Sequence, residues 1–225
     1  GLRERWEEYE KAIAAQSKFL LSETIYTHQT AVVEGKRTGG DPDCFKFFLE
    51  RAFQLLRHKG RAGLIVPLGL QSSQGCTALR RMLLDECSLE SLCKLDNSRG
   101  IFPGVTSLQK FDLVVFAKGG PTKEFSAAFY SCEPADVLVS FDSDPRKLSI
   151  EADFIKKLDS TYYTFIEVRS PTELALVRRI YEQFPKLGEK IEGAWNVSFS
   201  RELDMTNDAH LFREGARLAE MGARM

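Results

Sequence analysis

The feature that most constrains the fold is a helical pattern followed at once by a short apolar run, within residues 41–67. The run at residues 62–67 reads Ala-Gly-Leu-Ile-Val-Pro, which is typical of a strand buried on both faces of a parallel sheet. A helix packed on a sheet is therefore predicted. The apolar residues before the run recur at helical spacing and form one face: Phe45, Phe48, Leu49, Ala52, Phe53 and Leu56.

Both ends of this helix carry sequence signals. Asp41 is placed to cap the first turn, and Pro42 suits the first helical position because its missing N–H would have no partner there. Lys59-Gly60 provides the expected stop. Asp41 and Asp43 lie close together beside two glycines, but a cap and a first-turn charge account for both without any function.

The following segments alternate between helix and strand patterns. A helix is predicted at residues 74–87 and a strand at 89–95, followed by a strong strand at 111–116. A Gly-Gly-Pro turn then leads to another strand at 124–132. This order predicts an α/β fold: a partial Rossmann-like sheet with an antiparallel hairpin, formed by the last two strands, at its edge.

Beyond residue 132 the pattern becomes mostly helical. Helices are predicted at residues 149–158 and 170–184, the second opened by Ser170, Pro171 and Glu173 as a capping box. We expect residues 1–132 to form one domain and residues 133–225 a helical connector. The chain starts without Met in a charged helix and stops in another helical pattern, so both ends are expected to be cuts through a longer protein.

The composition indicates a packed protein, with 43% hydrophobic and 28% charged residues. The formal net charge of −1 lacks the basic excess of a stand-alone DNA-binding domain, so any DNA contact must use local charge or a second module. Apolar runs are too short to cross a bilayer, and the cytoplasm is expected. The five scattered cysteines predict reduced, buried thiols rather than a disulfide or metal site: Cys44, Cys76, Cys87, Cys93 and Cys132.

Signatures of familiar catalytic sites are missing from the sequence. It contains no glycine-rich dinucleotide loop, phosphate loop, zinc-protease helix or nucleophile elbow. The three histidines, His28, His58 and His210, are dispersed, and each is interpreted as a surface polar residue. The residues by themselves therefore indicate an α/β protein without naming its purpose.

Three blocks of sequence together resemble a known family. Residues 44–67, CFKFFLERAFQLLRHKGRAGLIVP, resemble the helix and strand that follow the catalytic loop of adenine-N6 DNA methyltransferases of the type IIG restriction-modification and phage-defence kind. Residues 101–116 are similar to the next turn and strand, and residues 195–208 to the segment that leads toward target recognition. Family members bind S-adenosylmethionine on a glycine loop and hold the adenine with Asn/Asp-Pro-Pro-aromatic. Neither motif occurs in this chain.

The resemblance implies a fragment of the catalytic domain with no catalytic or metal-binding residue of its own. The intact parent would transfer a methyl group from S-adenosylmethionine to adenine N6 in double-stranded DNA, whereas this chain alone should be inactive and bind no cofactor. A strand edge left uncovered would favour a homodimer. The open alternative is a non-catalytic DNA-binding or protein-interaction scaffold derived from a methyltransferase. An unrelated α/β enzyme would need a nucleophile or phosphate loop that the sequence lacks.

The family flips its target adenine out of the duplex and grips it between aromatic side chains. The resemblance places the second aromatic position at Phe102, followed by Pro103, while a core Phe that anchors the turn is an equal alternative. The residues after this turn are candidate DNA contacts, although a solvated loop explains any single one: Val105, Thr106, Ser107 and Lys110. Asp41 and Asp43 are candidates for the rim of the active site.

Overall fold

The computed structural model describes residues 1–22, 24–38, 42–131 and 147–189, together with residues 191–193, 197, 200, 202–214, 217–218 and 222. The chain divides into two units, Gly1–Ile180 and Tyr181–Met225. The predicted domain boundary after residue 132 lies next to residues outside the described part and stays a prediction. In the second unit the described residues include one short 3-10 turn, η4 (Ala209–Leu211).

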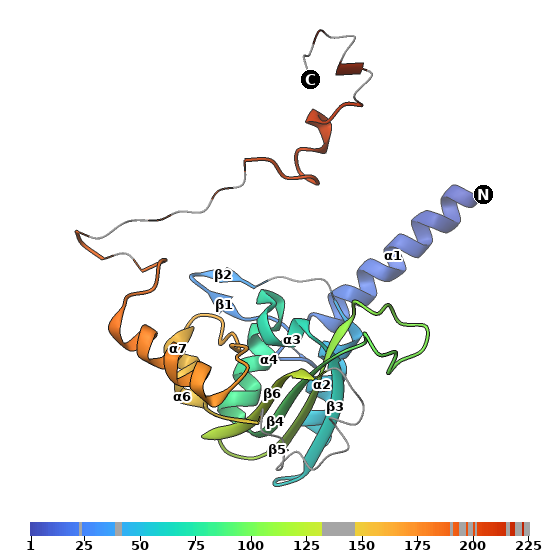
Figure 1. The fold of residues 1–225 in the computed structure, drawn as a ribbon. Helices are drawn as coiled ribbons and strands as arrows, with labels where there is room; N and C mark the ends of the chain where they lie inside the picture. Colours follow the sequence, from blue (N-terminus) through green and yellow to red (C-terminus); the bar gives the residue numbers. More distant parts are fainter. Residues whose placement is uncertain are drawn as a thin grey trace. The chain divides into compact units, whose positions relative to one another are not determined.

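The first unit is built on a mixed five-stranded sheet, which confirms the predicted α/β class (Figure 1). The sheet pairs are antiparallel except for β4 with β6, which is parallel. Because β5 runs antiparallel to both β3 and β4, the strands β3, β4 and β6 all point the same way. The order across the sheet is β3 (Arg61–Pro67), β5 (Lys110–Lys118), β4 (Cys87–Asp96), β6 (Glu124–Ser131) and β7 (Leu148–Glu151).

The predicted hairpin between β5 and β6 is wrong, because β6 pairs with β4 and β5 lies between β3 and β4. The chain passes the end of β4 at Thr122, whose hydroxyl accepts from Leu89 N at 2.7 Å and donates to Leu83 O at 2.8 Å. These bonds hold the connection across β4 instead of letting it fold back on β5. An antiparallel edge does exist, and β6 and β7 form it.

Strand β3 is the terminal strand of the described sheet rather than a strand buried on both faces. Only Val66 of β3 is fully buried, and Ile65 is 54% exposed. The reason is that helices cover one face of the sheet, which β3 meets with every second residue (Ala62, Leu64, Val66). The apolar run at residues 62–67 therefore has two parts. Alternate residues face the main core, and the others lie at a sheet edge that the described residues leave open.

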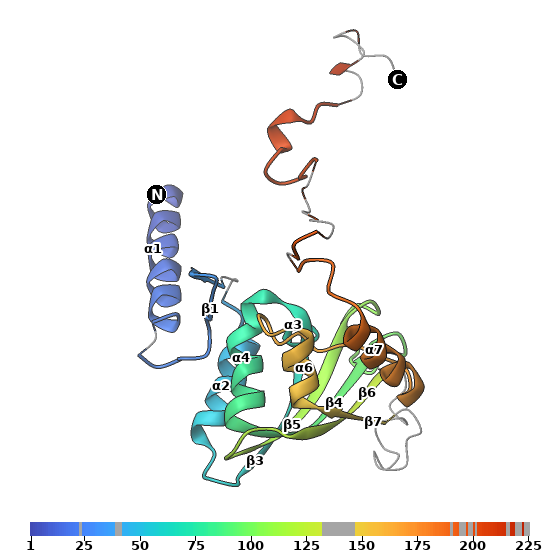
Figure 2. The ribbon, with the colours of Figure 1, turned by 90° about the vertical axis from the view of Figure 1, so that its left-hand side faces the viewer.

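The main core lies between the sheet and the helices gathered over one side of it (Figure 2). Leu49, Leu70, Leu79 and Ile155 come from four of these helices and have no exposed surface. A short π-helical turn, Met82–Glu86, links α4 to β4. The helices are α2 (Cys44–Leu55), α3 (Gly69–Ser72), α4 (Thr77–Arg81), α6 (Ala152–Leu158) and α7 (Pro171–Gln183).

Helix α2 begins two residues later than predicted. Its cap is Asp43, whose side chain accepts a hydrogen bond from Phe45 N at 3.4 Å, while Asp41 lies outside the described residues. The apolar face is also rotated: Phe48 is 69% exposed and Phe47 is buried. Helical spacing alone does not show which of two neighbouring aromatic residues is buried. Here the contact with Tyr26, at a ring distance of 5.0 Å, draws Phe47 inward.

Helix α7 begins at the predicted residue, but Glu173 accepts from the residue before the cap and not from Ser170 N as in a capping box. Glu173 N donates to Ser170 Oγ at 3.2 Å, and Glu173 Oε2 accepts from Arg169 N at 2.6 Å. The first part of the predicted helix at residues 149–158 is instead strand β7. Of the cysteines, Cys44 is exposed and not buried as predicted, and Cys132 lies outside the described residues. The remaining three are buried and form no disulfide, as predicted.

Two elements precede α2. Helix α1 (Leu2–Leu20) has no buried residue. The short strands β1 (Val32–Val33) and β2 (Lys36–Arg37) form a hairpin whose turn, Glu34-Gly35, has positive φ at both residues, as tight hairpin turns require. Among the described helices, none is long and apolar enough to cross a membrane.

Candidate nucleic-acid interface

The candidate site lies where β3, β4 and β6 end, at one edge of the sheet. Open α/β sheets bind ligands outside the carboxyl ends of their parallel strands. Here the segment 97–109 leaves β4 and returns into β5, and Figure 1 shows it in green, extending past the strand ends. This segment contains the predicted base-stacking residues and three of the four predicted DNA contacts, and the fourth, Lys110, is the first residue of β5.

Asn97 organises this segment. Its side chain is 1% exposed, and its amide nitrogen donates to three backbone carbonyls, at 3.1 Å to Phe102, 2.9 Å to Val105 and 3.3 Å to Thr106. Its amide oxygen accepts from Phe102 N at 2.8 Å. One buried side chain thus sets the path of the turn. Asn97 was not predicted from the sequence, although an Asn beside a Gly-containing turn is a common organiser of loop backbone.

Phe102 is half-buried and packs its ring against Phe111 at a centroid distance of 5.0 Å and an angle of 71°. It belongs to a small apolar cluster on the sheet face opposite the main core, with Cys93 and Leu95. The core-anchoring interpretation therefore has direct contacts. Part of the Phe102 ring remains accessible, so these contacts do not exclude base stacking, which stays a prediction. Pro103, next in the chain, is exposed.

The four predicted DNA-contact residues, Val105, Thr106, Ser107 and Lys110, are all exposed. The hydroxyl of Thr106 accepts from Leu108 N at 3.4 Å, which leaves Ser107 at the tip of a local turn. Their role as phosphate contacts is a proposal that this exposure permits.

Asp43 has an ordinary structural partner. Asp43 caps α2, because its carboxylate accepts a hydrogen bond from Phe45 N. Its position just before the helix in the sequence explains this role. A place for Asp43 on an active-site rim stays a prediction. Asp41 lies outside the described residues.

Near the same strand ends lies a buried polar pair that the sequence did not reveal. Gln71 Nε2, from α3, donates to Asp112 Oδ1, on β5, at 2.5 Å, and Asp112 has no exposed surface. Gln71 Oε1 and Asp112 Oδ2 lack a hydrogen-bond partner. Burial raises the pKa of Asp112 to about 7, against the opposing effect of the Gln71 hydrogen bond. A protonated Asp112 has an O–H group, which is the hydrogen-bond donor that is missing between these two oxygens.

A second buried charged residue lies next to Asp112, on the neighbouring strand. Lys94 on β4 pairs in register with Asp112, but its ammonium group forms an ion pair with Glu167. The Lys94 ammonium also lies 5.2 Å from the centre of the Tyr130 ring, on β6. The carboxyl ends of these strands therefore combine an exposed loop with buried polar groups.

His28 differs from the surface residue predicted from the sequence. Its Nδ1 lies 3.1 Å from Glu50 Oε1, and its Nε2 lies 2.8 Å from Glu86 Oε1. Burial alone would lower the pKa of His28, but the hydrogen bonds to both carboxylates raise it above its usual value. Glu50 is fully buried, so this pair ties the segment after α1 to α2. His58 and His210 are exposed, as predicted.

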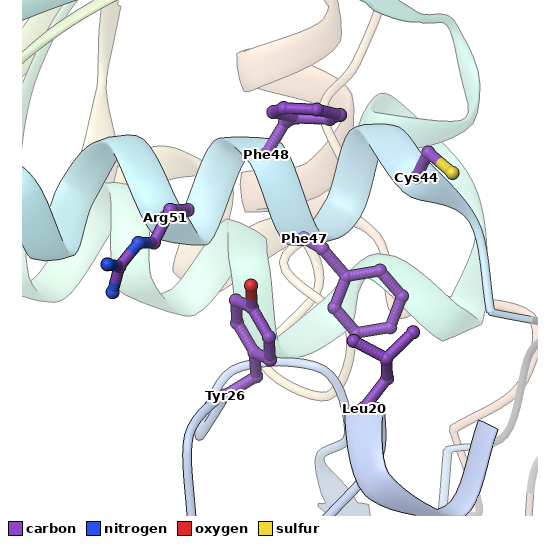
Figure 3. Close-up of a pocket in the computed structure, with 6 residues that line it drawn as sticks. All are labelled: Leu20, Tyr26, Cys44, Phe47, Phe48 and Arg51. Atoms are coloured by element: carbon purple, nitrogen blue, oxygen red, sulfur yellow. The ribbon is translucent and has the colours of Figure 1, made fainter. Parts of the chain in front are cut away.

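An apolar groove lies where α1 ends against α2 (Figure 3). Leu20 and Phe47 lie side by side in it, Tyr26 lines it from the following loop, and Phe48 points out of it. Arg51 contributes the charged group of the lining. This groove is a surface for apolar contact, and its lining carries no acid–base pair or nucleophile–base pair that would suggest catalysis.

Among the described residues, no cluster of three or more His, Cys, Asp or Glu side chains could hold a metal ion. Two side chains that follow or end β3 and β4 already have partners, since Gln71 donates to Asp112 and the Asp96 carboxylate accepts from Ser98 N at 3.0 Å.

Part of the chain matches a known family of methylases. Residues 16–102 match the Eco57I restriction-modification methylase family. Over 78 residues the chain is 36% identical to the type I restriction enzyme EcoEI methylase subunit of Escherichia coli. That match covers 34% of this chain and 15% of the relative, so the chain spans only a small part of the relative's length.

Solved structures of two further methylase subunits resemble the chain at lower identity. The type I restriction-modification methyltransferase subunit of Streptococcus thermophilus is 16% identical, with 65% of this chain and 34% of that chain covered and a TM-score of 0.47. The type I EcoKI M protein is 17% identical, with 68% and 45% covered and a TM-score of 0.44. Because the curated relative is a type I subunit, the type IIG assignment stays a prediction.

Proposed function

We propose that this chain is part of a restriction-modification DNA methyltransferase whose intact form transfers a methyl group from S-adenosylmethionine to adenine N6. The observation that carries the proposal is the methylase match over residues 16–102, which contains α2, β3, β4 and the start of the exposed loop. The matched segment thus ends at the edge where the candidate DNA contacts lie. Catalytic and cofactor-binding groups are assigned to other parts of the parent protein, and we expect this chain alone to be inactive.

The contribution of this chain is to bind and orient DNA. The cofactor, bound elsewhere in the parent, supplies the methyl group. Phe102, held by Asn97 and backed by Phe111, presents its accessible ring surface to the extruded adenine. Val105, Thr106, Ser107 and Lys110 contact the adjoining backbone. A rigid aromatic support reduces the freedom lost when a flipped base is captured, and base–aromatic stacking is worth about 1–3 kcal/mol.

The test is a methyl-transfer assay with labelled S-adenosylmethionine and double-stranded DNA. It compares this chain with a protein extended upstream through the encoded gene. We expect transfer to adenine N6 only by the extended protein, and loss of most of that activity in its Phe102→Ala variant, with Phe102→Tyr as the aromatic control. Transfer to cytosine would contradict the adenine assignment, and transfer by the chain alone would contradict its predicted inactivity.

A scaffold that binds another protein is the second candidate. Helix α1 favours it, because the large apolar side chains Trp6, Tyr9 and Ile13 are exposed along it. The open edge of β3 likewise offers a surface for a homodimer. If the extended protein transferred no methyl group and formed a stable dimer in sedimentation, the scaffold function would be favoured over methylation.

A further inference from the structure

Tyr130, at the carboxyl end of β6, has a backbone conformation that a tyrosine rarely adopts. Its φ is 66°, in the left-handed region, where a side chain crowds the backbone. Such strain of a non-glycine residue persists only where the surrounding structure holds it, and it gathers at functional sites. The ring is not hidden by this arrangement, since Tyr130 is 44% exposed.

A β-bulge accompanies the strain. Cys93 of β4 pairs with Ala128 of β6, but Leu95 pairs with Ser131, so two residues of β6 face the single residue Lys94. Bulges commonly redirect a side chain next to a functional site. Here Phe129 stays in the main core, whereas Tyr130 leaves the strand alternation and presents its ring at the edge of the sheet.

Two cations lie against this ring. Lys94 Nζ is 5.2 Å and Arg169 Cζ is 5.1 Å from the ring centre. Lys94 is buried and forms an ion pair with Glu167, so its charge is balanced inside the protein. Arg169 is exposed, and its guanidinium group presents a planar set of donors that matches a phosphate.

The backbone of Arg169 is held on both sides. Val168 before it is buried in the main core, and the backbone N–H of Arg169 donates to Glu173 Oε2 at 2.6 Å. Farther back, Phe165 N donates to Gln71 O at 3.0 Å, which attaches this segment to the same end of the sheet. An arginine fixed in this way, with its side chain on an aromatic ring, loses less conformational freedom when it binds an anion.

We propose that Tyr130 and Arg169 form a second DNA contact beside the 97–109 loop, in which Arg169 binds a backbone phosphate and Tyr130 positions its guanidinium group. The proposal rests on the proposed function for DNA as the ligand. Both residues lie at the carboxyl ends of the strands. Tyr130 is near the end of β6, which lies beside β4, the strand that the loop leaves, and Arg169 lies on the Tyr130 ring. The strain at Tyr130 is retained because the ring must stand where Arg169 can rest on it.

The test measures binding of a fluorescent 20-base-pair duplex to the full chain across a series of salt concentrations. Arg169→Ala should weaken binding roughly fivefold at low salt and reduce the slope of log affinity against log salt by about one. The matched control is Arg178→Ala. Arg178 also lies over an aromatic ring, that of Phe154 at 4.7 Å, but it pairs with Glu151 at the opposite end of the sheet.

Substitutions of Tyr130 separate positioning from packing. Tyr130→Phe should keep the wild-type affinity, since the ring and not the hydroxyl supports Arg169. Tyr130→Gly should bind DNA as weakly as Arg169→Ala, with no decrease in the midpoint of urea unfolding, because glycine relieves the left-handed strain. A lowered midpoint together with unchanged DNA affinity would show that Tyr130 only packs, and would overturn its positioning role.

Two results would overturn the DNA contact itself: an unchanged salt slope for Arg169→Ala, or no duplex binding by the wild-type chain at low salt. Neither depends on methyl transfer by the extended protein, which tests the proposed function separately. Binding that depends on Arg169, together with an extended protein that transfers no methyl group, would support this contact and contradict the proposed enzyme. One strand of the same duplex serves as a second probe, and preference for it over the duplex would overturn a duplex contact.

Discussion

The two ends of the sheet are built differently. At the amino ends of β4 and β6, the buried hydroxyl of Thr122 donates to Leu83 O and accepts from Leu89 N, and the ring of Phe116 has no exposed surface. At the carboxyl ends, Asp112 and Gln71 keep buried oxygens without partners, and a long loop is exposed. The first end is arranged for stability, whereas the second keeps features that stability alone does not explain.

This contrast indicates which end of the sheet is functional in a chain that has no catalytic motif. Polar groups that are buried and incompletely paired destabilise a protein by about 1–3 kcal/mol each, so a fold keeps few of them without a reason. In this protein Asp112, the strained Tyr130 and the loop held by Asn97 all lie at one end. Four measurements test that contrast.

Truncation of one aromatic residue at each end should give the largest contrast. Phe116→Ala should lower the free energy of unfolding by about 3–5 kcal/mol, because it leaves a cavity in the main core. Phe102→Ala should lower it by no more than about 1.5 kcal/mol, since the ring is half-exposed and has mainly one aromatic partner. Urea unfolding monitored by circular dichroism measures both. Equal losses would remove the distinction between the two ends.

Asp112→Asn should stabilise the protein in a pH-dependent way. Burial raises the pKa of Asp112 from 3.8 to about 7, so the folded state binds its proton more tightly than the unfolded state. The stability that this proton provides is complete below about pH 4 and is lost as the pH rises through about 7. Asparagine is neutral throughout, and the variant should gain about 2–4 kcal/mol relative to wild type by pH 8 and little at pH 4.

Unfolding free energies measured from pH 4 to pH 8 check this prediction. Asp43→Asn is the control, because Asp43 is an exposed cap at the start of α2. If Asp112→Asn destabilised the protein equally at every pH, the charged carboxylate would be a stabilising partner, and the contrast between the sheet ends would be weaker.

Removal of the loop organiser should have a smaller, local effect. Asn97→Ala removes hydrogen bonds to the backbone of Phe102, Val105 and Thr106, and we expect a loss of about 1–3 kcal/mol of unfolding free energy. Amide hydrogen exchange should accelerate within residues 98–109 more than in β4. Exchange that rose equally in both would mean that Asn97 supports the sheet and not the loop.

The smallest effect is expected at the edge strand β3. Arg61 and Glu90 form an exposed ion pair at 2.7 Å, and such pairs contribute less than about 1 kcal/mol. Arg61→Ala should shift the unfolding midpoint only slightly, and the shift should vanish at about 1 M salt because salt screens surface charges. A loss above about 2 kcal/mol would show that this edge is more tightly closed than the exposure of Ile65 indicates.

Much of the local structure follows directly from the sequence. The capping signal of Ser170 and Glu173 marks the start of α7, and the run at residues 62–67 marks β3, since both signals need only a few neighbouring residues. The family resemblance at residues 44–67 was also readable and lies within the segment that the methylase family matches.

Long-range partners were beyond the sequence. The pairing of β6 with β4, the contacts of His28 with Glu50 and Glu86, and the position of Tyr130 each depend on segments far apart in the chain. Periodicity says which side of an element is apolar, but it does not say which element covers that side.

An α/β chain with a helix–strand unit, a capped helix and a glycine-containing loop at residues 100–104 can be predicted from local sequence alone. The strand order, the hydrogen bonds of Asn97 to that loop and the raised pKa of Asp112 arise only in the folded protein. The physical reason is range. Helix caps, turns and periodicity act over a few residues, whereas strand pairing and burial depend on the whole packed core.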